Sequence, residues 1–208
     1  MRPFRALAAL ALIAVLPGCG SLGGPDIPVQ VYSPVAKVQP DAAWPVVPWS
    51  LTVAAASGTQ ALDSSRIAVR PTPTELQTYK GAAWADDAPE LLETAVVAAF
   101  EDSDRVGSVS RYGGGSRGDF ALVLEVRAFE SVYRGATPDA VIEVQARLVD
   151  LKSDRVASKR FLHTVPVSGV EVPQVVAAFG EAMSASSRDI VGWTLVEGQQ
   201  LRAEAAKP

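Results

Sequence analysis

The sequence predicts an α/β sandwich, in which a mixed, largely antiparallel sheet is packed by two main helices. Apolar and polar residues alternate through 120–133 and 140–151, which is the period of half-buried strands. Apolar residues recur three or four positions apart in 89–103 and 172–195, which is the period of amphipathic helices. Both strands have one apolar and one charged face, so we expect the helices to cover a single side of the sheet.

Residues 1–18 have the pattern of a secretory signal peptide. Arg2 and Arg5 form a positive start, and the apolar run 6–16 is too short to cross a bilayer, which needs about 20 residues. Cys19, the only cysteine, follows a small residue at the expected cleavage site. This arrangement is typical of a bacterial lipoprotein and predicts that Cys19 is acylated and becomes the first residue of the mature protein.

Two neighbours of Cys19 refine this prediction. Pro17 stands where lipoprotein signals usually carry a small or β-branched residue, which leaves an ordinary secreted protein open as the alternative. Gly20 stands where an aspartate marks retention in the inner membrane of some bacteria. We therefore expect a protein that is lipid-anchored and faces the periplasm, with the outer membrane favoured over the inner.

The charge balance excludes several partner classes. The chain has 23 acidic and 19 basic residues, and removal of the signal takes away two basic ones. An acidic chain without a basic face argues against nucleic acid and against electrostatic binding to anionic lipid headgroups. With Cys19 acylated, no thiol remains for a disulfide or a thiolate metal site.

Residues 19–48 are rich in proline and glycine and show no apolar period. We expect a lipidated tether, stiffened by proline, that lifts the folded domain away from the membrane. The aromatic residues Trp44 and Trp49 near its end are expected to pack on the edge of the domain. The domain is expected to span 49–196, and the polar, alanine-rich segment 197–208 is expected to be a flexible tail.

The domain is expected to begin with strands at 49–55 and 66–70. Residues 75–86 are expected to cross to the first helix without forming a strand. Asp87 or Ala88 is expected to cap that helix, since Pro89 then falls in its first turn.

Four strands and a helix are expected after the first helix. A short strand at 106–112 and a loop at 113–118 precede the strand 120–133, whose apolar face is expected to carry four residues: Leu122, Leu124, Val126 and Ala128. The strands 140–151 and 155–167 are expected to form a hairpin. The last helix is expected over 172–195, which gives the order β-β-α-β-β-β-β-α.

Residues with catalytic or metal-binding chemistry are few. His163 is the only histidine, and a lone histidine on a strand is expected to be structural. The glycines at 113–115 precede Ser116 and a strand, whereas a phosphate-binding loop ends in lysine and opens a helix. Arg117-Gly118-Asp119 matches an adhesion tripeptide, and a chance match is the favoured reading. The sequence therefore predicts a binding or adapter module with no enzymatic activity, cofactor or metal.

Several segments resemble, in order, the ABC-type transport auxiliary lipoprotein component family, which is similar to paraquat-inducible protein C. They are Leu62 to Arg70, Glu75-Leu76, Tyr79, Ala83 to Asp86, Leu122 to Glu130, Ala157 to Phe161, Val175 to Ala182 and Ile190 to Trp193. The family usually has a tyrosine-x-leucine stretch soon after the lipid site, and Val31 to Pro34 keeps only the tyrosine.

The resemblance implies an anticodon-binding-like sandwich, similar to the N-terminal domain of a periplasmic Tol protein. It implies partnership with a mammalian-cell-entry (MCE) domain protein, a permease and an ATPase, in a system that moves phospholipids or other hydrophobic molecules across the envelope. Self-association is compatible with such an adapter. The alternative is a structural lipoprotein that scaffolds another periplasmic assembly.

Six residues match the signature of the family: Tyr79, Trp84, Asp86, Phe129, Phe179 and Trp193. We expect them to be structural rather than ligand-binding. Tyr79 and Trp84 are expected to cover the open end of the sheet, and Asp86 to cap the first helix.

Overall fold

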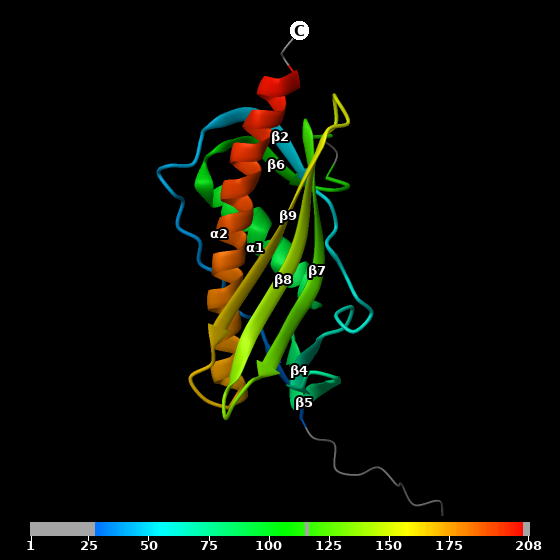
Figure 1. Ribbon diagram of the computed structural model, residues 1–208, viewed down its shortest axis with the longest axis vertical. Helices are drawn as coiled ribbons and strands as arrows, with labels where there is room; N and C mark the ends of the chain where they lie inside the picture. Colours follow the sequence, from blue (N-terminus) through cyan, green and yellow to red (C-terminus); the bar gives the residue numbers. More distant parts are fainter. Residues whose placement is uncertain (1–27, 115–116, 206–208) are drawn as a thin grey trace, which may run out of the picture.

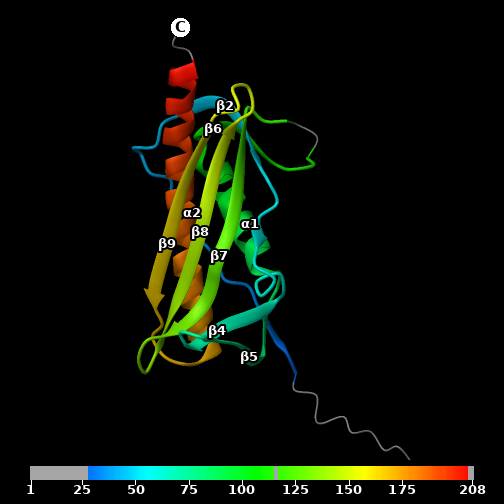
Figure 2. The same cartoon turned by 45° about the vertical axis from the view of Figure 1, so that its right-hand side comes forward.

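The computed structural model describes residues 28–114 and 117–205. A mixed sheet of nine strands forms one layer and two helices form the other, as Figure 1 and Figure 2 show, so the predicted mixed α/β sandwich is confirmed. The elements are β1 (Gln30–Tyr32), β2 (Val47–Val53), β3 (Ser57–Gly58), β4 (Arg66–Thr72), β5 (Glu75–Trp84), α1 (Ala88–Ser103), β6 (Val106–Arg111), β7 (Phe120–Tyr133), β8 (Pro138–Asp150), β9 (Val156–Pro166) and α2 (Val172–Ala205). Cys19 lies outside the described residues.

Strand β7 organises the sheet. One of its edges pairs with β8 along the whole strand, and β8 pairs in turn with β9, both antiparallel. Its other edge receives β2, β3 and β4 one after another, each parallel. The longest ladders are thus antiparallel, as predicted, but parallel ladders are more numerous among the described residues because β1 and β6 also pair in parallel.

A β-bulge at Arg127 corrects the expected face of β7. The register with β8 shifts between Val126 and Ala128, so one extra residue is inserted and the alternation of side chains reverses. Leu122, Leu124 and Val126 are buried as predicted, but beyond the bulge it is Phe129, not Ala128, that lies in the core.

The segment from Glu75 to Trp84 is a strand, which corrects the expectation of a simple crossing. β5 pairs antiparallel with β4 and in parallel with β1. Its first half is largely exposed, so it shows no apolar alternation from which a strand could be predicted. Backbone pairing on both of its edges stabilises β5 instead.

Helix α1 has the predicted bounds to within a residue. The Asp87 carboxylate accepts the backbone N–H of Glu90 at 2.9 Å, and Pro89 lies in the first turn. Asp87 is therefore the N-cap, and the expectation that Asp86 caps this helix is wrong. Asp104 ends the helix in a left-handed conformation, with φ of 51°.

Helix α2 is longer than predicted, since it runs to Ala205 instead of ending near residue 195. The part of the expected flexible tail that the structure describes is helical. Its 34 residues span about 51 Å, and Figure 1 shows that α2 runs along the long axis of the domain. Buried Leu195 and Leu201 hold this last part against the body of the protein. No described helix is both long and apolar enough to span a membrane.

Residues 33–46, termed the strap below, lie along α2 instead of continuing the expected tether. The backbone N–H of Lys37 donates to Oγ of Ser184 at 2.9 Å, and Asp41 accepts from Arg188 at 2.8 Å. Trp44 is only 9% exposed. The strap is therefore part of the folded domain.

Glycines on α2 make room for the strap. A Cβ added to Gly180 would lie 2.8 Å from the carbonyl oxygen of Val35, and one added to Gly192 would lie 2.6 Å from Nε1 of Trp44. Both distances are shorter than a normal contact. Two glycines about three helical turns apart thus determine how closely the strap approaches.

The substitution Gly192→Leu is expected to displace the strap. Overpacking of a close contact costs about 1–3 kcal/mol, which exceeds the gain of up to about 1 kcal/mol in helix propensity. Urea unfolding should show a net loss of stability, and trypsin should cleave faster after Lys37. The control is Glu181→Leu at an exposed position of the same helix. Unchanged trypsin protection of Lys37 in Gly192→Leu would contradict this role of glycine.

Candidate functional site

Three of the aromatic signature residues form one cluster inside the core. Trp84 from β5 lies edge-on to Phe129 from β7 and Phe179 from α2, with ring centroids 5.8 and 5.2 Å apart. Phe129 and Phe179 stack at 4.6 Å. None of the three is more than 1% exposed. The cluster joins the sheet to α2 and offers no surface to a ligand.

Tyr79 and Asp86 lie outside this cluster. The Tyr79 hydroxyl is 2.9 Å from Oγ of the buried Ser131, and burial raises the pKa of Tyr79 to about 12. The phenol therefore stays neutral at physiological pH and acts as a hydrogen-bonding group. Asp86 is exposed, and no other described residue forms a hydrogen bond or ion pair with it.

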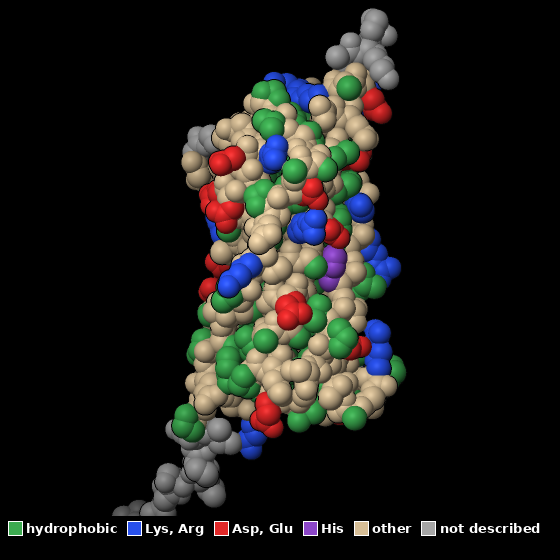
Figure 3. Space-filling model, turned by 90° about the vertical axis from the view of Figure 1, so that its left-hand side faces the viewer, with side chains coloured by type: hydrophobic (Ala, Val, Ile, Leu, Met, Phe, Trp, Pro, Cys, Tyr) green, Lys and Arg blue, Asp and Glu red, His purple; other side chains and the backbone are tan. Residues whose placement is uncertain are grey.

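Trp193 differs from the three aromatic residues of this core cluster because it is only partly buried. It packs edge-on against Phe161 of β9, with centroids 5.8 Å apart. Its other side faces an open groove of about 520 Å³. The groove is lined by the strap, by β9 and by α2, through Asp41, Ala43, Trp44, Lys159, Arg188, Asp189, Gly192, Trp193 and Val196. We call this the α2 groove; Figure 3 shows the side of the molecule on which α2 and the strap lie.

The charges around the α2 groove are unevenly paired. Arg188 bonds Asp41 at 2.8 Å, and Nε2 of His163 lies 3.4 Å from Asp189. Lys159 lies over the Phe161 ring, 5.2 Å from its centroid, and no carboxylate of a described residue forms an ion pair with it. The groove thus combines apolar side chains, two carboxylates that lie beside Arg188 and His163, and one cation, Lys159, that is available to an acidic group.

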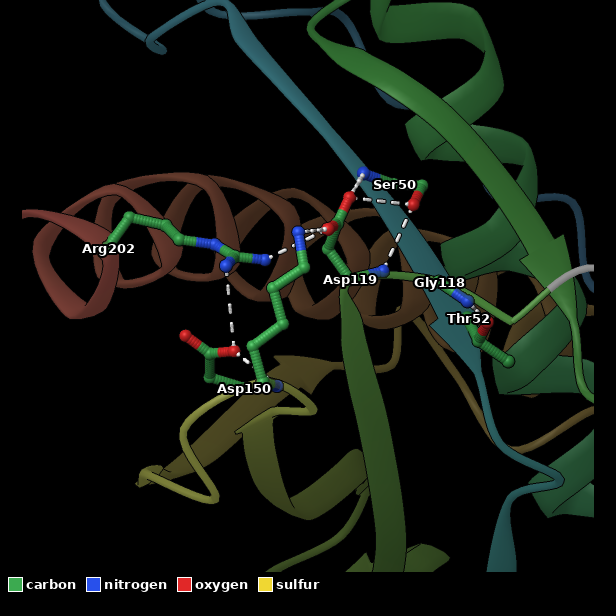
Figure 4. Close-up of polar contacts among 7 residues, drawn as sticks. Ser50, Thr52, Gly118, Asp119, Asp150 and Arg202 are labelled. Carbon is green, nitrogen blue, oxygen red and sulfur yellow. Dashed lines mark hydrogen bonds and ion pairs between the residues drawn. The ribbon is translucent and has the colours of Figure 1, made fainter. Parts of the chain in front are cut away.

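A second polar cluster lies at the far end of the sheet, where β2, β7, β8 and α2 meet (Figure 4). Oδ2 of Asp119 accepts the backbone N–H and the hydroxyl of Ser50, both at 2.9 Å. Oδ1 of Asp119 lies 2.6 Å from Nζ of Lys152 and 3.1 Å from Nη2 of Arg202. Arg202 also lies 3.8 Å from the buried Asp150. These bonds hold the pKa of Asp119 below its usual range, chiefly through Lys152 and then Ser50.

The Asp119 cluster has a structural arrangement. The Ser50 hydroxyl donates to Asp119 while it accepts the Asp119 N–H at 3.0 Å, so it is held in a reciprocal pair and not aimed at a substrate. The Arg202 guanidinium lies over the Phe120 ring at 4.7 Å, which fixes the end of α2 to β7. No group of metal-binding side chains occurs among residues 28–114 and 117–205.

Sequence reasoning missed both the groove and the cluster. Ser50, Asp119, Lys152 and Arg202 are far apart in the chain, and Arg202 fell in the expected tail. The α2 groove combines a strap that the sequence assigned to a tether with an exposed face of α2. The one sequence signal for the α2 groove was Trp193, a large aromatic residue on the last helix.

One family model matches most of the chain. The family model of the ABC-type transport auxiliary lipoprotein component matches residues 31–191. The crystal structure of protein XCC0632 from Xanthomonas campestris, a DUF330 protein, is 44% identical, with a TM-score of 0.81 over 84% of this chain and 99% of that one. A second solved structure, 15% identical, covers 74% of this chain and 97% of that one with a TM-score of 0.59, which shows a shared fold alone.

One curated relative matches part of the chain. Protein bll6063 from Bradyrhizobium diazoefficiens is 29% identical over 113 residues, which is 54% of this chain. The aligned part spans only 30% of the Bradyrhizobium protein.

Proposed function

Because the chain belongs to the ABC-type transport auxiliary lipoprotein component family, we propose that it is the envelope-anchored adapter of an MCE-type ABC transporter. Its partners would be an MCE-domain protein, a permease and an ATPase that move phospholipids or other hydrophobic molecules between membranes. The observation that carries the proposal is the family match, which extends from β1 into α2 and includes the strap. The proposal assigns the chain no catalytic step.

The anchor of this adapter would be the acylated Cys19. Each buried CH₂ of an acyl chain contributes about 0.8 kcal/mol, and two or more chains make attachment to a membrane stable. β1 begins at Gln30, so only a short segment separates the anchor from the sheet. Gly20 favours the outer membrane, with the domain in the periplasm. A relation to the anticodon-binding-like fold and to the Tol N-terminal domain is part of the same proposal.

Affinity purification from detergent-solubilised membranes tests this function. The tagged full chain is expected to recover an MCE-domain protein. The Cys19→Ser variant is expected to leave the membrane fraction and recover much less of this partner, because anchoring raises the effective concentration of the domain at the membrane. Recovery without any MCE-domain protein, repeated under several detergents, would overturn the proposal.

The second candidate is a structural lipoprotein that scaffolds another assembly. The elongated domain, held together by the buried aromatic cluster and by the Asp119 cluster, fits that role as well. Deletion of the gene distinguishes the transport adapter from the scaffold. Loss of phospholipid exchange between the membranes supports the transport adapter. A defect of cell shape or permeability with normal exchange supports the scaffold.

A further inference from the structure

We propose that the free edge of β9 binds an extended acidic segment of a partner polypeptide. The segment would pair with β9 as an added strand, and its inward side chains would cover the α2 groove. This partner site goes beyond the proposed transport role and does not depend on which envelope system the chain serves.

In the described part of the chain, the backbone of β9 is unpaired along its outer edge. β9 pairs with β8 alone, and no hydrogen bond from another described residue reaches its outer edge. Two hydrogen bonds flank the ladder with β8. The N–H of Asp150 donates to the carbonyl oxygen of Arg155 at 2.9 Å, and the N–H of Val167 donates to the carbonyl oxygen of Pro138 at 3.0 Å.

These two bonds fix the alternation of the whole ladder. In an antiparallel pair, residues that bond the neighbour alternate with residues whose N–H and C=O point away. The odd-numbered residues of β9 therefore bond β8. The even-numbered residues direct their N–H and C=O groups away from β8, toward solvent. They are Val156, Ser158, Arg160, Leu162 and Thr164. Such an edge is a template for another strand.

The α2 groove lies beside this edge. Odd-numbered side chains of β9 face the helix layer, as the buried Phe161 shows. An added strand would direct alternate side chains the same way, across Trp193 and Val196 and toward Trp44 of the strap. Val196 is 42% exposed, and the groove holds about 520 Å³. A strand edge next to an apolar groove gives main-chain bonds for affinity and side-chain contacts for specificity.

The charge of β9 selects the kind of partner. Residues 155–165 contain three cationic side chains and His163 but no acidic residue. Arg160 is paired with Glu143 at 2.8 Å, whereas Lys159 has no such partner among the described residues. Pairing β9 with the β9 of a second copy would bring like charges together, which destabilises a sheet. A segment with an acidic residue opposite Lys159 and apolar residues beside it fits instead.

The probe is a short end-capped peptide of valine and threonine with one central glutamate. It is titrated against the full chain in detergent micelles, and a peptide with lysine in place of the glutamate serves as control. The glutamate peptide is expected to slow hydrogen exchange at the outward amides of Ser158, Arg160 and Leu162, and to bind at least about tenfold more tightly than the lysine peptide. Binding to the exposed variant Lys159→Glu is expected to show the opposite preference.

A proline substitution tests the backbone pairing itself. Leu162→Pro removes an outward N–H without touching the bonds to β8, and proline is tolerated on edge strands. It is expected to weaken binding about tenfold or more, while Leu162→Ala, which keeps the N–H, is not. Circular dichroism checks that each variant folds, and Lys159→Glu tests the proposal even if the proline variant does not.

Four results would overturn the proposal. They are equal binding of the two peptides, binding unaffected by Leu162→Pro in a folded protein, protection of the same amides by phosphatidylglycerol micelles without peptide, and protection that appears on concentrating the protein alone. The third would assign the groove to lipid and the fourth to self-association. Failure to recover an MCE-domain protein would leave the peptide result intact, so the two proposals fail separately.

Discussion

Replacing Trp84 by alanine is expected to destabilise the domain by about 3–5 kcal/mol, a large part of the 5–15 kcal/mol that holds a typical domain folded. Trp84 is 1% exposed, and its indole contacts Phe129 and Phe179, which belong to different layers. The substitution leaves a cavity where the sheet meets α2. Urea unfolding, followed by circular dichroism, measures the loss.

Two other variants separate this packing role from a ligand-binding role. Nε1 of Trp84 has no hydrogen-bond partner among the described residues, so Trp84→Phe removes a buried unpaired donor along with some volume and is expected to cost less. Trp193→Ala, in the open groove, is also expected to cost less stability. A stable Trp84→Ala variant that has lost partner recovery would contradict the structural assignment.

Replacing Asp119 by asparagine is expected to cost about 2 kcal/mol at neutral pH, the usual range for hydrogen bonds to charged groups. The side chain is 23% exposed and bonds Lys152, Arg202 and Ser50 together. An asparagine that keeps its oxygen toward Ser50 turns its NH₂ group toward two cations. The end of α2 should loosen as a result.

The effect of Asp119 is expected to depend on pH. Its pKa is lowered in the folded state, mainly by Lys152 and then by Ser50. A depressed carboxyl pKa stabilises the fold fully above the unfolded value of about 3.9, and this stability is lost as the pH falls through the folded pKa. The stability difference between the native protein and Asp119→Asn should therefore be full at pH 7 and decrease below about pH 4. Asp102→Asn, on the exposed side of α1, is the control, and a pH-independent difference would contradict the ionic origin.

The strands and helices with a strong apolar period could be predicted from the sequence. β8 and α1 follow the expected pattern because each buries one regular face, so local spacing alone identifies them. The acidic composition and the lone cysteine at position 19 likewise follow from the sequence without any tertiary information. The family resemblance also follows from the sequence, and the family match agrees with it.

Other elements depend on partners that are distant in the chain. β5 is stabilised by backbone pairing on two edges, which leaves no apolar pattern to detect. Because of the bulge at Arg127, the side chain of Phe129 and not that of Ala128 lies in the core. The bulge thus breaks the alternation from which the buried face of the strand was predicted. The strap has too many prolines for regular structure, and only the glycines of α2 show where it packs.

The sequence by itself determined the class of the fold, the positions of its strongly periodic elements and the expected lipid site at Cys19. Tertiary structure alone decided which aromatic signature residues lie in the core and which one borders the α2 groove. Trp84, Phe129 and Phe179 meet in the core, whereas Trp193 lies between the strap and the free edge of β9. The physical reason is that periodicity records which side of an element is apolar. It does not record whether the next layer covers that side, because the covering segments come from elsewhere in the chain.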